Sequence, residues 1–398
     1  MPTPEQARLA LAFSCVGHAF SHVFMLLYPT VVLALGPVFH MEYGDLLLLA
    51  LAGNVLFGAM ALPAGWLGDR WSAEGMMAIF FLGTGGASIA TGLAPSPLWL
   101  AVGLALIGTF AAIYHPVGIA WLVRSAASRG RALGVNGVFG SLGTAGAAVV
   151  AGALTAWLGW RWAFIVPGIV CVAVGLGFVV AVRTGRIVAA KVDRHPEPAP
   201  SRGDMVRVFW VLSLTMLATG LIWQAAQTAM PKLFDERLGQ DSDVLRTGSL
   251  VTAALLFGVL AQIAGGYLAD RFPLRRVYLT GFWVQAPLLA ALAYVGGPAI
   301  VPAAAVLIFF NTGITPAENA LLARYTPANW RATAFGAKFV LAIGVASAST
   351  ALVALVHNAT GSFALLFVGL AAVAAASALA AHGLPRQGRT PRVAAAAE

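Results

Sequence analysis

The chain has 398 residues, of which 60% are hydrophobic and only 10% are charged. Soluble globular domains carry roughly 25% charged residues, so this composition excludes a water-soluble fold and indicates a membrane protein. The net charge of +9 does not indicate nucleic-acid binding, because the basic residues lie in short stretches between apolar runs. Cys15 and Cys171 both lie inside apolar runs, so no disulfide framework is expected.

Twelve apolar runs are long enough, at about 20 residues, to cross the hydrocarbon core of a membrane as helices. The first run is longer than the apolar core of a signal peptide and lacks a small-residue cleavage site at its end. The even number of runs places both ends of the chain on one side of the membrane. In chain order the predicted spans are residues 9–35, 44–64, 75–94, 97–122, 132–156, 160–182, 207–230, 247–269, 276–295, 298–323, 332–356 and 361–382.

The distribution of arginine and lysine predicts the orientation of these spans. With the N-terminus in the cytoplasm, the inner segments hold 19 of the 24 lysines and arginines, and the opposite orientation would invert this bias. We therefore expect a multi-pass protein of the cell (inner) membrane with both termini cytoplasmic. The inner residues are Arg8, Arg70, Arg124, Arg129, Arg131, Arg183, Arg186, Lys191, Arg194, Arg202, Arg207, Arg271, Arg275, Arg276, Arg324, Arg331, Arg386, Arg389 and Arg392.

The two halves of the chain are related in sequence. The tripeptide Leu-Phe-Gly at 56–58 recurs at 256–258, and Pro116, Arg124 and Arg131 recur as Pro316, Arg324 and Arg331. A parallel repeat of this kind predicts an all-α fold of two pseudo-symmetric six-helix bundles, residues 1–182 and 207–383. The proline-rich polar stretch 183–206 is expected to be a cytoplasmic linker, and residues 384–398 a disordered cytoplasmic tail.

A six-residue motif occurs at the same place in both halves. Residues 65–70 are Gly-Trp-Leu-Gly-Asp-Arg, and residues 266–271 are Gly-Tyr-Leu-Ala-Asp-Arg. As turns between membrane helices, these copies resemble the loop 2–3 and loop 8–9 signatures of the major facilitator superfamily. The resemblance covers essentially the whole chain and implies a secondary transporter whose signature loops take part in gating. The residues with this implied role are Gly65, Asp69, Arg70, Gly266, Asp270 and Arg271.

Each residue type in the motif has an expected role. Gly65 and Gly266 are expected to let a helix end and to bring the backbone close to its neighbour. Asp69 and Asp270 are expected to cap an adjacent helix or to pair with a nearby arginine. The simpler alternative is a solvated turn that only helps to fix the topology.

Two ionisable side chains lie inside predicted spans, where a charge is expensive. Glu318 is the only acidic residue well inside a span, and Lys338 is the only lysine or arginine so placed. Both lie roughly 9–10 Å from the cytoplasmic ends of consecutive antiparallel helices, at about 1.5 Å per residue. We predict a direct or water-bridged ion pair. It either fixes helix packing or exchanges a proton, with the lysine as partner or as anchor for an anionic substrate.

The fourth predicted span carries Tyr114, His115 and Pro116 near its middle, where the proline frees a backbone carbonyl. This His-Pro element resembles a subgroup of the superfamily that includes fosmidomycin-resistance-type exporters. The chain lacks the arginine of the fourth helix and the Gly-Pro-x-x-Gly-Gly run of the fifth that proton-coupled drug antiporters often carry. The fifth span instead holds glycines that are expected to let helices approach closely: Gly134, Gly137, Gly140, Gly143 and Gly146.

In the first span His18 and His22 share one helix face, with Cys15 and Met25 three residues to either side. Three interpretations remain open: a cavity wall with hydrogen bonds and a proton site, simple packing, or a stripe of ligands for a soft metal. No second group of cysteine and methionine completes a coordination shell, so no metal site is assigned.

Further polar side chains within the spans are candidates for a cavity wall or for contacts between helices. Gln224 and Gln227 share a face near Trp223, which favours a ligand-facing patch. The whole set comprises Asn54, Asn136, Trp223, Gln224, Gln227, Gln262, Gln285, Asn311 and Asn319.

Together these residues predict a secondary active transporter that moves a small polar or anionic organic solute by alternating access. The energy source is expected to be a proton gradient, with Glu318 and one of the histidines as carriers. The chain has no Gly-rich nucleotide-binding motif, so ATP-driven pumping is not expected. Neither a cofactor nor enzymatic activity is expected. The expected partners are the solute, protons and membrane lipid, without nucleic acid, and a monomer is expected to function.

Two alternatives to this prediction stay open. One is a proton-driven exporter of drugs or toxic compounds. The other belongs to a different class and is a transition-metal transporter, or an intramembrane metal-binding protein, that uses the His, Met and Cys stripe of the first span.

Overall fold

The computed structural model describes residues 3–125, 129–187, 202–238, 243–326 and 331–385, and the regular structure of these residues is helical throughout. Most of the predicted linker and almost all of the predicted tail, residues 188–201 and 386–398, lie outside the described residues.

Several predicted spans of the first half consist of consecutive shorter helices. The first span continues from a long helix into three short turns, and the second and fourth spans are each divided in three. Proline stands at the start of several pieces, where its missing N–H is least costly. The elements are α1 (Pro4–Leu26), α2 (Tyr28–Val31), η1 (Val32–Ala34), α3 (Gly36–Phe39), α4 (Tyr43–Leu48), α5 (Leu51–Ala59), α6 (Ala61–Arg70), α7 (Ala73–Gly92), α8 (Pro97–Ala111), η2 (Tyr114–Gly118), α9 (Ile119–Ser125), α10 (Arg129–Leu158) and α11 (Trp162–Arg183).

The second half has longer uninterrupted helices and one divided span. That span, the tenth, is broken after Gly313, and Pro316 lies in the first turn of the helix that follows. The elements are α12 (Arg202–Arg237), α13 (Val244–Arg271), α14 (Leu274–Leu292), η3 (Gly297–Ala299), α15 (Ile300–Gly313), α16 (Thr315–Tyr325), α17 (Arg331–Thr360) and α18 (Ala364–Ala381).

Ten helical segments of the described residues are long and apolar enough to cross a membrane. They coincide with ten of the twelve predicted spans, and the other two, 276–295 and 332–356, fall on α14 and α17. Large apolar side chains such as Leu176, Trp210 and Leu365 are exposed, as helices that face lipid require. The chain is therefore a multi-pass membrane protein.

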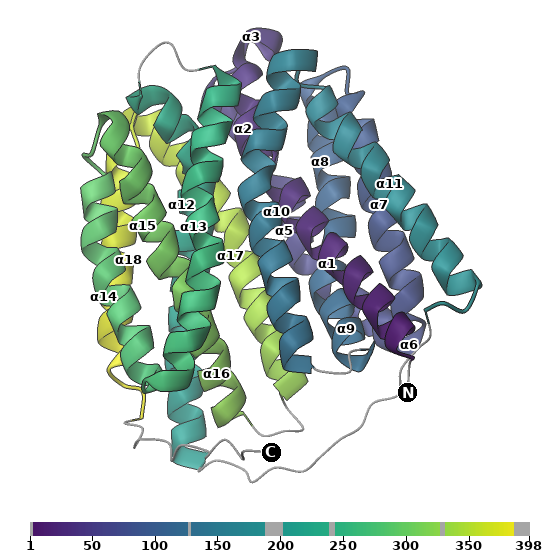
Figure 1. Cartoon of the computed structure of the whole chain (residues 1–398). Coiled ribbons are helices and arrows are strands. Elements are labelled where there is room, and N and C mark those ends of the chain that lie inside the picture. The colour runs from purple at the N-terminus through teal and green to yellow at the C-terminus, as the bar shows by residue number, and fades with distance from the viewer. Residues whose placement is uncertain (1–2, 126–128, 188–201, 239–242, 327–330, 386–398) are drawn as a thin grey trace.

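The helices form two groups that lie side by side (Figure 1). The first group, α1 to α11, and the second, α12 to α18, approach each other at the end opposite the N-terminus and diverge towards the end that carries it. At the approaching end Asn358 donates to Asp45 at 3.0 Å, and Thr252 donates to the Ala145 carbonyl at 2.6 Å. We call the end where the two groups approach each other the far end, and the end that carries the N-terminus the terminal end.

The six-residue motifs are not turns, which corrects the prediction from sequence. Residues 65–70 are the last turns of α6, and residues 266–271 are the last turns of α13, so neither Gly65 nor Gly266 ends a helix. In the first copy the turn between α6 and α7 lies after Arg70, at residues 71 and 72. Ser72 caps α7 by accepting from the Gly75 N–H at 2.9 Å. In the second copy Pro273 stands directly before α14.

The expected close approach at glycines holds at some positions and fails at others. A Cβ added at Gly65 would lie 3.3 Å from Pro116 Cβ, whereas one added at Gly266 would meet nothing within 4 Å. In α10, Gly140 and Gly143 pack closely against α1, but Gly134, Gly137 and Gly146 face open space. The prediction was therefore wrong for Gly266 and for three of the five α10 glycines, because their helix faces have no close neighbour.

Candidate functional site

A buried hydrogen-bonded network joins three helices of the first half. The side-chain amide of Asn136 donates to the Tyr114 hydroxyl at 2.7 Å and to Ser14 Oγ at 3.1 Å. The Tyr114 hydroxyl donates in turn to the Ser14 carbonyl at 2.8 Å. All three residues are buried, and these polar groups satisfy one another, so the network fixes α1 against η2 and α10. Nothing in the sequence indicated Ser14, because a serine in an apolar helix carries no pattern by itself.

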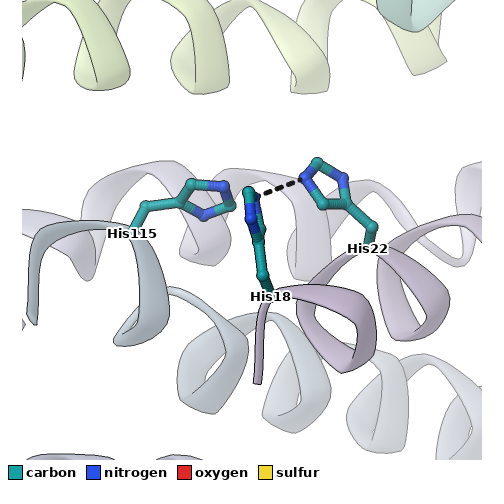
Figure 2. A group of neighbouring side chains, drawn as sticks. All are labelled: His18, His22 and His115. Atoms are coloured by element: carbon teal, nitrogen blue, oxygen red, sulfur yellow. Dashed lines mark hydrogen bonds between the residues drawn. The ribbon is translucent and has the colours of Figure 1, made fainter. Parts of the chain in front are cut away.

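Three histidines lie together beside this network, and their side chains converge from two elements (Figure 2). The ring centres of His18 and His22 are 5.0 Å apart, and the ring centre of His115 lies 5.5 Å from each. His18 Nδ1 is 2.8 Å from the carbonyl oxygen of Asn136, and His22 Nε2 is 3.3 Å from His18 Nε2. The sequence predicted the shared face of His18 and His22, but it gave no reason to add His115.

The local backbone explains how these rings meet. Residues 114–118 form a π-helical turn in which Pro116 cannot donate a backbone hydrogen bond, so the regular ladder of the fourth span is interrupted. Tyr114 stacks on His18 with ring centres 5.0 Å apart. A Cβ added at Gly140 would lie 2.5 Å from the His18 ring, so only glycine leaves room for the imidazole there.

In the second half the predicted ion pair is present. Lys338 Nζ lies 2.6 Å from Glu318 Oε1, and both side chains are buried, with 10% and 3% of their surfaces exposed. Glu318 lies in the first turn of α16, where the positive end of the helix dipole favours a carboxylate. The break between α15 and α16 therefore supplies a helix N-terminus inside the membrane-spanning region.

Three further groups lie around this pair. The Tyr278 hydroxyl donates to Glu318 Oε2 at 2.7 Å and lies 2.9 Å from Thr215 Oγ1. Lys338 Nζ also donates to Asn319 Oδ1 at 2.6 Å, which brings one of the predicted amides into the site. Tyr278 and Thr215 were missed from sequence, because hydroxyls on α14 and α12 have no fixed spacing from the acid on α16.

The remaining predicted polar residues fall into different environments. Asn54 donates to Thr350 Oγ1 at 2.6 Å and so joins the two halves, whereas Asn311 donates to Gln285 at 2.8 Å within the second half. Gln224 donates to Thr228 at 3.3 Å. Trp223 reaches the first half, where its ring centre lies 6.1 Å from that of His22.

Gln227 is the unusual member of this set. It is buried, at 4% exposed, and among the described residues neither its amide oxygen nor its amide nitrogen has a hydrogen-bond partner. Because buried amides are rarely left unpaired, this side chain departs from the usual pattern.

The acidic and basic residues of the two motifs behave differently. Asp69 pairs with Arg124 of the same half at 3.6 Å, as expected, and Arg70 lies over the Trp66 ring at 4.9 Å. Arg271 lies over the Tyr267 ring at 4.3 Å. Within the described part of the chain Asp270 forms no ion pair.

The cavities of the described residues differ in place and size. An apolar cavity of about 260 Å³ lies between α13, α14 and α15, with Leu268, Phe272 and Phe309 in its wall, and no residue of the two polar groups lines it. Between the two halves, near Asn54 and Gln224, the free space is about 10 Å³, roughly enough for one water. The two halves thus pack closely at this point, and hydrogen bonds join them at the far end.

Two helix bundles that enclose buried polar side chains define a membrane transporter of the two-lobed type. The sequence model of the Major Facilitator Superfamily matches residues 11–337 and 212–398, so the chain belongs to this superfamily of transporters. Its fold is also similar to that of a bacterial homologue of the human lysosomal transporter Spinster, in an inward-facing and unoccupied conformation. That likeness has a TM-score of 0.72 at 15% identity, over 96% of this chain and 95% of the other.

Two curated relatives match shorter parts of the chain. A puromycin resistance protein from Streptomyces alboniger is 35% identical over 129 residues, which cover 32% of this chain and 26% of that protein. A probable sulfoacetate transporter from Cupriavidus necator is 28% identical over 239 residues, which cover 54% of each chain. The chain thus spans between about a quarter and about half of the lengths of these relatives.

Proposed function

We propose that the protein is a proton-coupled secondary transporter of a small anionic organic solute. The buried pair of Glu318 and Lys338 is the observation that carries this proposal, because an ionisable pair inside a membrane span marks a pathway for substrate or protons. Protonation of Glu318 removes its charge and frees the Lys338 ammonium to bind an anionic group of the solute. The proton and the solute are then taken up together. The relative named as a probable sulfoacetate transporter supports an anion as substrate.

The solute is bound between the two bundles, residues 1–182 and 207–383, which rock about it. His18, His22 and His115 with Tyr114 and Asn136 form the wall on the first half and offer a second proton site. Trp223, Gln224 and Gln227 form the opposite wall together with Asn54, Asn311 and Asn319. The closed far end supports an arrangement open towards the terminal end, and the motif residues of α6 and α13 act in the gate there.

The terminal end faces the cytoplasm of the cell, and the protein lies in the inner membrane as a monomer surrounded by lipid. The arginine-rich segments between the spans support this orientation. Fusion of a cytoplasm-dependent reporter after residue 385 tests it. Fluorescence of such a fusion is expected, and a silent but intact fusion would contradict the orientation.

The transport proposal is tested by uptake into proteoliposomes with and without an imposed pH gradient. The solutes are sulfoacetate, a panel of simple carboxylates and a hydrophobic cationic drug. Accumulation of an anion is expected only with the gradient. The Glu318→Gln variant is expected to lose gradient-driven accumulation but to keep exchange of labelled for unlabelled solute. Glu42→Gln changes an exposed acid and serves as the matched control.

A second candidate function is the export of a toxic compound. It is favoured by the relative named as a puromycin resistance protein, although the arginine and the Gly-Pro-x-x-Gly-Gly run typical of drug antiporters are absent from the sequence. Movement of the cationic drug against a pH gradient, with no response to any anion, would establish export in place of the anion proposal.

A further inference from the structure

The three histidines have the spacing of metal ligands. Their ring nitrogens include one from each side chain that lie within 4.8 Å of one another. In a tetrahedral site with metal–nitrogen distances of about 2.0–2.1 Å, neighbouring ligand nitrogens are about 3.3 Å apart and imidazole ring centres about 5 Å apart. The observed separations are 3.3 Å between His22 Nε2 and His18 Nε2, and 5.0–5.5 Å between ring centres.

The surroundings of His18 prepare one nitrogen for a metal. The Asn136 carbonyl oxygen can only accept, so His18 Nδ1 carries the proton and donates to it at 2.8 Å. His18 Nε2 is then unprotonated and lies 3.3 Å from His22 Nε2. A metal-ligating histidine usually donates its other ring N–H to a partner such as a backbone carbonyl, which fixes the tautomer and the orientation of the ring. The Tyr114 ring and the space left by Gly140 hold the His18 ring in this orientation.

The ligand set differs from the stripe expected from sequence and is chemically more uniform. Cys15 does not belong to the group of ligand atoms, and Met25 instead packs among apolar residues next to Phe57. Three neutral imidazoles suit zinc and the neighbouring divalent transition metals, whereas magnesium and calcium require oxygen ligands. No acid takes part, so the bound cation keeps its charge and attracts an anion.

We propose that His18, His22 and His115 form a binding site for a divalent transition-metal ion of the zinc type. Three protein ligands leave a fourth position open, which is the arrangement of zinc sites that exchange an outer ligand. This position takes water or an anionic group. Trp223 of α12, in the second half, lies beside the ligands, with its ring centre 6.1 Å from that of His22. The site does not depend on the proposed solute or on proton coupling.

Metal binding by the purified protein in detergent tests the site without any transport measurement. The affinity tag is removed, the protein is treated with a chelator, and Co²⁺ is added. One equivalent is expected to give the intense visible absorption of tetrahedral cobalt, and Zn²⁺ is expected to abolish it. The variants H18Q, H22Q and H115Q are each expected to weaken Zn²⁺ binding by at least about tenfold. The matched control is H40N, which removes an exposed histidine at a left-handed backbone position that asparagine also adopts.

X-ray absorption of the Zn²⁺-loaded wild-type protein provides a second measurement that needs no variant. The expected spectrum contains three imidazoles and one light ligand. Failure to bind one equivalent, a shell of oxygen ligands alone, or unchanged binding by the three variants would overturn the proposal. Any of these results leaves anion uptake, measured separately in proteoliposomes, unaffected.

Discussion

The two halves place different chemistry next to equivalent prolines. In the first half Pro116 lies in a π-helical turn beside His115, and the neighbouring polar groups are neutral donors and acceptors. In the second half Pro316 lies at the start of α16, and Glu318 follows two residues later with a lysine as its partner. The repeated sequence thus interrupts a helix beside an equivalent proline in both halves, but the form of the interruption and the side chains next to it differ.

The difference extends to the partners of these residues. At the spacing of 200 residues that relates Pro116 to Pro316, Glu318 corresponds to Gly118 and Lys338 to Val138. Removing one member of a buried ion pair costs about 3–5 kcal/mol, whereas a neutral hydrogen bond contributes about 0.5–1.5 kcal/mol. We therefore expect the second half to depend on charge and the first half on shape and hydrogen bonding.

The largest change in the free energy of unfolding is expected when the ion pair of Glu318 and Lys338 is broken. Lys338→Met leaves the Glu318 carboxylate buried without its cation, so the free energy of unfolding should fall by about 3–5 kcal/mol. Unfolding of the protein in detergent by heat or denaturant measures this change. The double variant Glu318→Gln with Lys338→Met removes both charges and should recover most of the loss, yet it should not restore gradient-driven uptake. Full recovery of uptake would make the pair a packing device only.

The first half should be more sensitive to space than to charge. Gly140→Ala places a methyl group against the His18 imidazole, so a loss of about 1–3 kcal/mol in stability and displacement of the histidine are expected. Gly146→Ala in the same helix meets open space and is the matched control. Thermal unfolding compares the two variants. Equal behaviour would mean that the His18 ring moves freely and that the crowding at this glycine has no energetic consequence.

The ion pair of the second half could be predicted from the sequence, whereas the histidine cluster of the first half could not. Glu318 and Lys338 are the lone ionisable groups of their spans and lie at equal depth on consecutive antiparallel helices, so their pairing followed from helix geometry. The meeting of His115 with His18 did not, because no spacing along the chain indicates which side of a proline-broken helix packs against the first helix. The twelve spans were likewise visible in the apolar runs, whereas the breaks within them depend on tertiary packing.

A matched pair of tyrosines sharpens the comparison of the two halves. Tyr278→Phe removes a hydrogen bond to a carboxylate, which contributes about 1.5–3 kcal/mol, together with a neutral one to Thr215. Tyr114→Phe removes only neutral hydrogen bonds, which contribute about 0.5–1.5 kcal/mol each. Both rings stay buried, so the loss of apolar contact is the same. Denaturant unfolding of both variants measures the difference. If Tyr114→Phe proves the more destabilising, the network of the first half is cooperative, and the proposed contrast between charge and shape fails.

The smallest change in stability is expected at the repeated motif, where the two copies again differ. Asp69→Asn breaks an exposed pair with Arg124, and such pairs contribute between 0 and about 1 kcal/mol. Asp270→Asn has no such pair to break among the described residues, so its effect on unfolding should be smaller still. If both carboxylates act in the gate, the two variants should nevertheless slow solute uptake to a similar extent while solute binding by the purified protein stays unchanged. Uptake that falls only in Asp69→Asn would tie the effect to the Arg124 pair instead, and the role of the motif would then belong to one half alone.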